Sequence, residues 1–500
     1  SADSFIEVQT DSEGSKTLPY SWKQQWYALT YSSYVPNPSK SSEVTPAAVF
    51  GEPLVLWREE DNGEIFCALD VCPHRQAALS EGRLRNGQLY CYYHGWEFSG
   101  KDSGACTRIP QLQEGATIPK RACLQMKTLR EEEGIVWVWM DDSTPPTKDP
   151  PATGILDKDG KQKGWNTYDF QIDLPYDHSF LVENLADPAH VDISHDSTPG
   201  GGKRERAKAY DMKIDQDSIS SDGFTGKFRQ NENLPYSDLV FEAPGIVRNK
   251  FEGKIGSSTV RFEAALHCMP LGLGRSRLLF RVFNKGLPKL ALFLLNLKPL
   301  WSRHLNSCKV LEQDVGLITT QEDYFARSKR ELKEDYLLLQ SSDTYVGAYR
   351  QWLDKVGHGM PWYQGLLSHN GGAIRSVPSN TLPPGLEPGY HRASNEDVVE
   401  TRYHRHVMNC PTTRNALRRI QLGKRISTAA AILAATALCS LSGVSTTSAP
   451  VAAVRWTQKL ARAILPLSVL ASACLRPLES KFFVSFKRKD QLRGESGLVP

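Results

Sequence analysis

The chain of 500 residues carries little net charge, and its cysteines form no regular pattern. A formal charge of +4, without basic stretches interleaved with aromatic residues, gives no case for nucleic-acid binding. The ten cysteines are scattered, which argues against a disulfide framework and for a reducing compartment. There is no internal repeat. The chain also lacks an initial methionine, an apolar signal core and an arginine-rich amphipathic start, so we expect a targeting peptide to have been removed or never to have existed.

One stretch carries two cysteines and two histidines in two tight pairs. Cys72-x-His74 is followed, after sixteen residues, by Cys91-x-x-His94. Two thiolates and two imidazoles in such pairs indicate a metal site. The set suits either a structural zinc ion or a Rieske [2Fe–2S] cluster, in which cysteines hold one iron and histidines the other.

The spacing favours the cluster. Cys-x-His is a poor zinc knuckle, because zinc knuckles usually contain Cys-x(2–4)-Cys. Each pair has one Cys and one His, so two apposed loops can give one iron both thiolates and the other iron both imidazoles. Residues 65–69 and 87–90 precede the pairs and read as strands, which places both pairs on loops. A structural zinc ribbon is the alternative.

Asp187, His190 and His195 form a second candidate site. Two histidines and a carboxylate are the residue types of a 2-His-1-carboxylate iron site. At about 100° per residue, Asp187 and His190 share one face of a helix, so the Asp can orient that His. His190 and His195 are about 140° apart on a straight helix, so they can face one metal only if the helix bulges or breaks. A surface helix with a capping Asp is the alternative.

Together the two motifs resemble those of Rieske-type non-haem iron oxygenases, over roughly residues 20–410. The resemblance implies a Rieske [2Fe–2S] cluster and a mononuclear Fe(II) that activates O₂. It also implies that Asp187 bridges to a cluster histidine of the next subunit in a homotrimer, and that Asn184 lies beside the iron. The metal ligands that it implies are His190 and His195 for the iron, and Cys72, His74, Cys91 and His94 for the cluster.

The carboxylate ligand must lie further along the chain, where Glu312 and Asp314 are the candidates. Residues 310–322 read as a helix, in which Asp314 shares a stripe with Val310 and Leu317 and points with the apolar residues that face a pocket. Glu312 points elsewhere and is expected in solvent. Related oxygenases carry the third ligand in a helix at a comparable distance. We therefore expect Asp314 to complete the iron site.

A narrower resemblance is to a plant and algal branch of these oxygenases. It implies a plastid enzyme that acts on a chlorophyll-type tetrapyrrole. Much of the branch has Cys-x-x-Cys before its membrane segment, but here only Cys410 is present, with Thr413 at the second place, so control by a local disulfide is not expected. The branch contains pheophorbide a oxygenase, chlorophyllide a oxygenase, the translocon-associated Rieske protein and the protochlorophyllide-dependent translocon component, the last being the nearest match. The resemblance rests on residues 173–178, 183–195, 312–314 and 341–361.

We expect an α+β fold, with an all-β Rieske domain followed by an antiparallel-sheet and helix catalytic domain of the helix-grip type, and C-terminal transmembrane helices. A sheet that clasps a long helix would give a deep apolar pocket, as a macrocycle needs. The expected parts are an N-terminal lead-in (1–45), the Rieske domain (46–145), the iron domain (152–363), a linker (364–425), a membrane anchor of one or two helices (426–478) and a basic tail (479–500).

The C-terminal region predicts a membrane hairpin. Residues 426–444 are uncharged and about as long as a bilayer core requires, and a buried helix of a soluble protein is the alternative. A second apolar run, 463–475, is short enough that it either spans with snorkelling ends or lies in the interface. Basic residues flank the pair on both sides, so a hairpin would put both flanks on one face. The apolar stretch 287–301 could be a pocket wall or a patch that dips into the membrane surface.

The expected function is that of a membrane-anchored monooxygenase. It would take electrons from ferredoxin or a similar donor and oxidise a ring methyl group of a protochlorophyllide- or chlorophyllide-like substrate to a formyl group with O₂. Its catalytic body would lie in the stroma, anchored in the inner envelope or thylakoid membrane. The alternatives are a ring-opening pheophorbide a oxygenase, a non-catalytic redox-sensing component associated with plastid import machinery, and a pure electron carrier.

Overall fold

The structure is a computed structural model that describes residues 20–59, 63–157, 164–198, 201–255, 258–327, 330–357, 401–442 and 451–485. The chain forms two compact units. One contains Ser1–Leu295 and Val310–Glu396, and the other contains Asn296–Lys309 and Asp397–Pro500. Parts of the predicted lead-in, linker and basic tail lie outside the described residues, and the predicted domain boundaries stay predictions.

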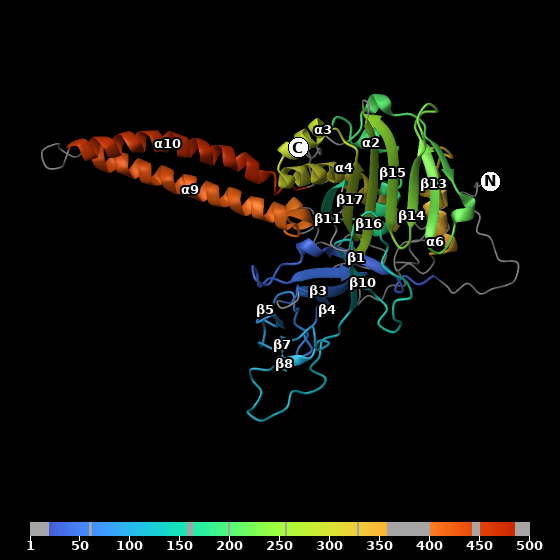
Figure 1. The fold of residues 1–500 in the computed structure, drawn as a ribbon, viewed down its shortest axis with the longest axis horizontal. Coiled ribbons are helices and arrows are strands. Elements are labelled where there is room, and N and C mark those ends of the chain that lie inside the picture. The colour runs from blue at the N-terminus through green and yellow to red at the C-terminus, as the bar shows by residue number, and fades with distance from the viewer. Residues whose placement is uncertain are drawn as a thin grey trace. The chain divides into compact units, whose positions relative to one another are not determined.

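The first part of the larger unit is all-β, as the strand patterns predict (Figure 1). Its strands form three small antiparallel sheets, in the orders β1-β10-β9, β2-β3-β4 and β5-β6-β7-β8. The strands are β1 (Trp26–Tyr31), β2 (Thr45–Val49), β3 (Glu52–Arg58), β4 (Ile65–Leu69), β5 (Arg83–Arg85), β6 (Gln88–Tyr90), β7 (Glu97–Phe98), β8 (Cys106–Arg108), β9 (Thr128–Glu132) and β10 (Ile135–Trp139).

The second part is a seven-stranded antiparallel sheet in the order β11-β17-β16-β15-β14-β13-β12. The alternating patterns at 238–242, 259–263 and 277–283 predict three of these strands, and all three are present. The strands are β11 (Asn166–Leu174), β12 (Asp211–Ile214), β13 (Gly223–Arg229), β14 (Ser237–Glu242), β15 (Ile246–Ile255), β16 (Ser258–Gly272) and β17 (Arg275–Lys285).

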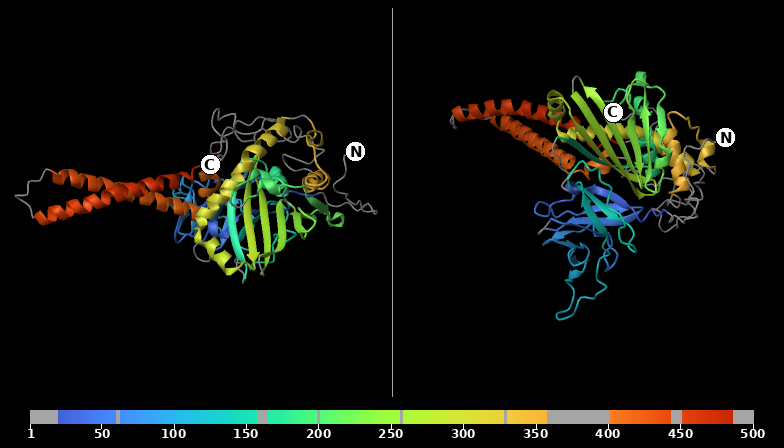
Figure 2. Two further views of the ribbon diagram at one scale, coloured as in Figure 1. Left: turned by 90° about the horizontal axis from the view of Figure 1, so that it is seen from above. Right: turned by 45° about the vertical axis from the view of Figure 1, so that its right-hand side comes forward.

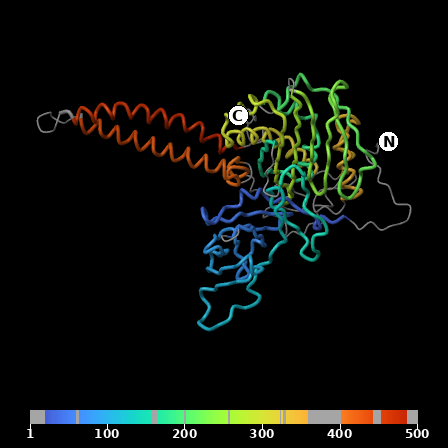
Figure 3. Tube along the Cα trace, viewed as in Figure 1, coloured from blue at the N-terminus to red at the C-terminus, as the bar shows by residue number. Residues whose placement is uncertain are grey.

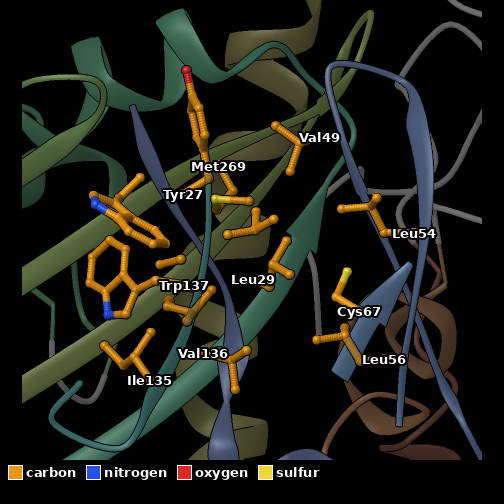
Figure 4. Close-up of a cluster of buried hydrophobic side chains, with 14 of the residues drawn as sticks. Tyr27, Leu29, Val49, Leu54, Leu56, Cys67, Ile135, Val136, Trp137 and Met269 are labelled. Atoms are coloured by element: carbon orange, nitrogen blue, oxygen red, sulfur yellow. The ribbon is translucent and has the colours of Figure 1, made fainter. Parts of the chain in front are cut away.

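The two parts share one hydrophobic core (Figure 4). Every residue of β1 and β10 is buried, which is the pattern of strands covered on both faces. Side chains of both strands, such as Leu29 and Trp137, pack together with Met269 of β16. Buried Arg277 adds polar contacts, because it donates to the Leu29 carbonyl at 3.0 Å and pairs with Asp173 at 2.6 Å. The aromatic residues Trp26 and Tyr27 near the start of the chain are therefore core residues.

Five helices contribute residues of the larger unit around the predicted iron site. Helix α1 (His178–Leu185) contacts β15, β16 and β17, and α6 (Thr344–Lys355) contacts β12. Asp177 caps α1, since its carboxylate accepts a hydrogen bond from the Ser179 amide at 2.9 Å. A short turn leads from α1 to α2 (Val191–Ser194). The long helix α4 (Leu300–Arg327) contains the predicted helix 310–322, and α5 (Leu332–Asp335) follows it.

Helix α3 (Lys289–Leu297) lies within the apolar stretch 287–301 and has no buried residue. Leu290, Phe293, Leu294 and Leu297 are all more than half exposed. An apolar helix with its side chains exposed in this way fits the second alternative, a surface patch.

The smaller unit is dominated by an antiparallel pair of long helices, α9 (Pro411–Ser442) and α10 (Val451–Ser480), which lie side by side in all views (Figures 2 and 3). Both are long and apolar enough to cross a membrane, over Pro411–Leu441 and Ala453–Ser480. The predicted hairpin is therefore present. The second apolar run differs from the prediction in length, because it belongs to a 30-residue helix that starts before the run and continues past it.

Candidate active site

The paired Cys and His residues lie on two loops of the same construction. Cys72 comes after β4 and Cys91 directly after β6. In each loop the cysteine carbonyl accepts a hydrogen bond, at 2.9 Å, from the amide four residues later, which belongs to Gln76 or Gly95. In each loop the cysteine amide also donates to the carbonyl five residues later, at 2.9 Å. Gln76 and Gly95 both have left-handed backbone conformations, with φ of 63° and 76°.

The loops separate the thiols from the imidazoles. Cys72 and Cys91 are buried in the core of this region, whereas His74 is exposed and His94 is half-buried. The two imidazole rings are 4.5 Å apart between centroids, and His74 stacks on Trp96 at 4.6 Å. The hydrogen bond between the two thiols lowers the pKa of Cys91 to about 6. Two thiols inside and two imidazoles outside is the arrangement that a Rieske cluster needs.

The geometry does not suit a single zinc ion. Four ligands around one zinc at 2.0–2.3 Å lie within about 4 Å of one another. Among the described residues, Cys72, His74, Cys91 and His94 provide no group of three whose ligand atoms all lie within 4.8 Å of one another. A two-iron cluster, in which thiols and imidazoles bind different irons, fits this wider spacing.

His190 and His195 flank a break in the chain rather than a straight helix. Helix α1 ends at Leu185, His190 immediately precedes α2, and His195 caps its C-terminal end with φ −107° and ψ 24°. The break turns the two rings together, with centroids 5.3 Å apart. The spacing of five residues requires such a break, and the structure has it.

Asp314 of α4 meets both histidines. Its Oδ2 atom is 3.2 Å from His195 Nε2 and 3.8 Å from His190 Nε2. The same oxygen is buried and accepts no hydrogen bond from any described residue. A buried carboxylate oxygen is costly unless it has a partner, and a metal ion would be that partner here. The structure therefore brings together the three residues predicted for the iron site, and their donor set suits non-haem iron with open positions.

The prediction for Glu312 is wrong in one respect. Glu312 was expected in solvent, but it is fully buried, with 0% exposure. The apolar stripe lies on one face of α4, but this part of α4 has buried side chains on more than one side. Asp314 is still the carboxylate that faces the histidines.

Asp187 orients His190 mainly through its backbone. Nδ1 of His190 is 2.6 Å from the Asp187 carbonyl, and the Asp187 carboxylate is 3.6 Å away. Oδ1 of Asp187 instead accepts a hydrogen bond from the Ala189 amide at 2.7 Å. Although burial lowers the pKa of His190, the carboxylates of Asp187 and Asp314 raise it above its usual range. The site is thus negative enough to attract a cation.

Gln313 is a residue of the site that the sequence reasoning missed. Its Oε1 atom is 3.0 Å from His195 Nδ1, and its amide nitrogen donates to Thr198 Oγ1 at 2.8 Å. An acceptor on the second ring nitrogen fixes the orientation of a metal-binding histidine and leaves Nε2 for the metal. Its position next to Asp314 is the signal that could have identified it.

We expect Gln313→Ala to weaken iron binding by about 10- to 100-fold, which is typical of removing the partner of a ligand histidine. The rotation of His195 is then no longer restrained, although all three ligands remain. Iron retained after dialysis against graded chelator concentrations measures the effect. Gln321→Ala is the matched control, because Gln321 lies on the same helix and contacts Glu183 rather than a histidine. Equal iron retention in the two variants would contradict this role of Gln313.

A cavity of about 380 Å³ is lined by His190 and Asp314, two of the three proposed iron ligands. Its lining is more polar than the deep apolar pocket that was predicted. Asn184, which is 3.4 Å from His190 Nε2, lies in its wall, as the resemblance implies. Glu183 is held there by Arg350 at 2.6 Å and by the Tyr336 hydroxyl at 3.2 Å. The wall of the cavity includes Asn184, Asp187, His190, Asp314, Leu317 and Tyr336.

Comparison with known proteins agrees with this geometry. Residues 25–125 match the family model of the Rieske [2Fe-2S] domain, and residues 241–331 match that of pheophorbide a oxygenase. Protein TIC 55, chloroplastic, of Arabidopsis thaliana is 36% identical over 475 residues, which cover 92% of this chain and 82% of that protein. Protochlorophyllide-dependent translocon component 52 of the same plant is 24% identical over 455 residues, or 79% and 74% of the two chains.

Among solved structures, dicamba monooxygenase bound to dicamba has a TM-score of 0.51 and 19% identity, and the match covers 66% of this chain and 96% of that chain. This likeness supports the fold. The expected resemblance to the plant branch is confirmed, with more identity to Protein TIC 55 than to translocon component 52. The chain therefore belongs to the Rieske-type non-haem iron oxygenases of the Protein TIC 55 and pheophorbide a oxygenase branch, and it is an oxygenase with a Rieske [2Fe–2S] cluster and a mononuclear iron.

Proposed function

We propose that this oxygenase oxidises a chlorophyll-type tetrapyrrole, converting a ring methyl group to a formyl group with O₂ and electrons from ferredoxin or a similar donor. The convergence of His190, His195 and the buried Asp314 oxygen beside a cavity carries the proposal. The names of the similar proteins, which refer to pheophorbide a and to protochlorophyllide, support the substrate class.

The proposed cluster ligands are Cys72 and Cys91 for one iron and His74 and His94 for the other. The proposed ligands of the mononuclear iron are His190, His195 and Asp314. Bound iron supplies O₂ activation at this site, with electrons delivered from the cluster. The chain's own contribution is to hold three ligands on one side of the site and leave the cavity side open.

The cavity supports entry of one edge of a macrocycle. Its volume of about 380 Å³ is near the lower end of the range for ligand pockets, about 300–1,000 Å³. Acidic residues, among them Asp187 and Asp343, lie in its wall and would repel a carboxylate of the substrate. We therefore infer that the substrate enters with an uncharged edge, which carries the methyl group, and keeps its acidic substituents outside.

The exposure of the cluster histidines supports assembly into a homotrimer. His74 is exposed, His94 is half-buried and the Asp187 carboxylate is about one-quarter exposed, at 24%. We propose that Asp187 of one subunit accepts a hydrogen bond from a cluster histidine of the neighbouring subunit. The carboxylate would then join two histidines through short hydrogen bonds and hold both in the correct tautomer.

The two long helices and the chloroplast names of similar proteins support a location in a chloroplast membrane, the inner envelope or the thylakoid. Basic residues at the first turns of α9, such as Arg418 and Arg419, lie at the same hairpin end as Lys481. Segments rich in Lys and Arg tend to stay on the side of the membrane from which the protein is inserted. We propose that this end and the catalytic part face the stroma.

We expect a chain that ends at Lys424 to leave the membrane and keep both metals, because it lacks both apolar spans. Carbonate washing followed by iron analysis of the soluble fraction measures this. The apolar face of α3 supplies the control, as Leu290→Glu with Phe293→Glu removes its affinity for lipid. If the truncated chain instead remains in the membrane fraction and is released only when it also carries the two substitutions, then α3, and not the hairpin, is the anchor.

An anaerobic titration of the reduced protein tests the proposed function. Chlorophyll precursors and breakdown products are added singly, oxygen is admitted, and the products are identified by mass spectrometry. We expect a precursor to gain oxygen at a methyl carbon. Cleavage of the ring of pheophorbide a would favour the ring-opening alternative. Oxygen uptake that no tetrapyrrole stimulates would favour a redox-sensing component associated with plastid import, as the name of the similar translocon protein suggests.

A further inference from the structure

A second group of metal-binding side chains lies in the smaller unit, and none of them belongs to the sites described above. His304 is in the first turns of α4, His406 is in a π-helix (Tyr403–Val407), and Cys410 immediately precedes α9. One ligand atom of each residue lies within 4.8 Å of one ligand atom of the others. His406 and Cys410 lie four residues apart in one segment, whereas His304 is 106 positions before Cys410, so the fold brings His304 to this pair.

Thr413 of α9 completes the group. His304 Nδ1 is 3.3 Å from Cys410 Sγ and 3.4 Å from Thr413 Oγ1. Thr413 Oγ1 is also 2.9 Å from His406 Nε2 and 3.3 Å from Cys410 Sγ. These separations are close to those between ligands of one tetrahedral zinc ion, which follow from metal–ligand distances of about 2.0–2.3 Å.

The burial of these four side chains suits a bound ion and leaves no room for an organic substrate. All four side chains are at most 1% exposed, so an organic molecule cannot reach them. Apolar residues, including Leu305, Val407 and Phe482, pack in the same part of the unit. An apolar shell keeps water from competing for the metal. The π-helix that carries His406 is a rare element that is frequently found at functional sites.

We propose that His304, His406 and Cys410 bind one Zn²⁺ ion, with the Thr413 hydroxyl or one water molecule as the fourth ligand. Two imidazoles and one thiolate are zinc ligands, and four-coordinate geometry is usual for this ion. Binding replaces the thiol proton of Cys410, which is released to solvent. No electron is transferred. The ion would join the beginning of α4 to the base of the α9–α10 hairpin.

The test uses the full-length protein, purified in detergent from zinc-supplemented cells. Zinc and iron are measured per chain by mass spectrometry after dialysis. We expect about one zinc in the wild type and at least a tenfold loss in Cys410→Ser and His304→Gln, with iron unchanged. Cys308→Ser is the matched control, because Cys308 is a buried cysteine of α4 outside the group. Unchanged iron shows that the larger unit stays folded.

Thr413→Cys is a variant that should bind zinc more tightly than the wild type. A second thiolate at this position creates a Cys₂His₂ set, so we expect slower zinc loss to a chelator than in the wild type. X-ray absorption at the zinc edge, which does not detect the irons, should show one sulfur neighbour in the wild type and two in Thr413→Cys. The same zinc content in wild type and Cys410→Ser, or a zinc shell without sulfur, would mean an adventitious ion only and would overturn the proposal.

Discussion

Asp314→Asn is expected to reduce the iron content from about three to about two per chain and to abolish substrate-dependent oxygen uptake. The substitution keeps the shape of the side chain but removes the charge that faces His190 and His195 at 3.8 and 3.2 Å. Two neutral imidazoles with one amide bind iron much more weakly than the 2-His-1-carboxylate set. Iron analysis together with the EPR signal of the reduced cluster separates the two metal centres.

Glu312→Gln is the control for this variant. Glu312 lies two residues away on the same helix and is just as buried, but Asp314 is the acid that faces the histidines. We expect Glu312→Gln to keep three irons and measurable oxygen uptake. If Glu312→Gln loses the iron and Asp314→Asn keeps it, the assignment of the carboxylate ligand is reversed. Loss of the cluster signal in Asp314→Asn would indicate general unfolding.

Asp187→Asn is expected to slow electron transfer from the cluster to the iron at least tenfold without loss of either metal. Nδ1 of His190 interacts with the backbone carbonyl of Asp187, which the substitution leaves in place. An asparagine Oδ1 can still accept the hydrogen bond from the Ala189 amide, so the turn is preserved. Only the negative charge and one acceptor are removed. A tenfold change corresponds to about 1.4 kcal/mol of barrier, a small effect for a charged bridge.

Rapid mixing of the reduced protein with O₂ and substrate measures this rate. Asp343→Asn is the matched control, because Asp343 lines the same cavity and its carboxylate accepts a hydrogen bond from the Leu339 amide instead. We expect Asp343→Asn to transfer electrons from the cluster to the iron at the wild-type rate. Electron transfer at the wild-type rate in Asp187→Asn would contradict the proposed route between subunits. A fully active monomer in sizing experiments would contradict it as well.

Ligand types in short motifs could be predicted from the sequence, because their chemistry is local. The two Cys/His pairs and the break between His190 and His195 are examples. The equivalence of Gln76 and Gly95 could not be predicted, since a left-handed backbone at a glutamine has no sequence signal. The role of Gln313 depends on a contact between segments 118 positions apart. Burial of Glu312 and the polar cavity wall likewise depend on which elements cover α4, and hydrophobic periodicity does not contain that information.

Helix α9 starts at Pro411, well before the apolar stretch at 426–444. The polar turns up to Arg425 rise about 22 Å at 1.5 Å per residue, which exceeds the thickness of one headgroup layer. With residues 426–444 as the membrane span, this part of α9 would stand above the bilayer as a stalk, and its number of residues would set both the height above the bilayer and the direction around the helix axis. Inserting seven residues would raise the Cys410 end by about 10 Å and turn it by only about 20°, whereas two residues would raise it by about 3 Å and turn it by about 160° to the opposite side.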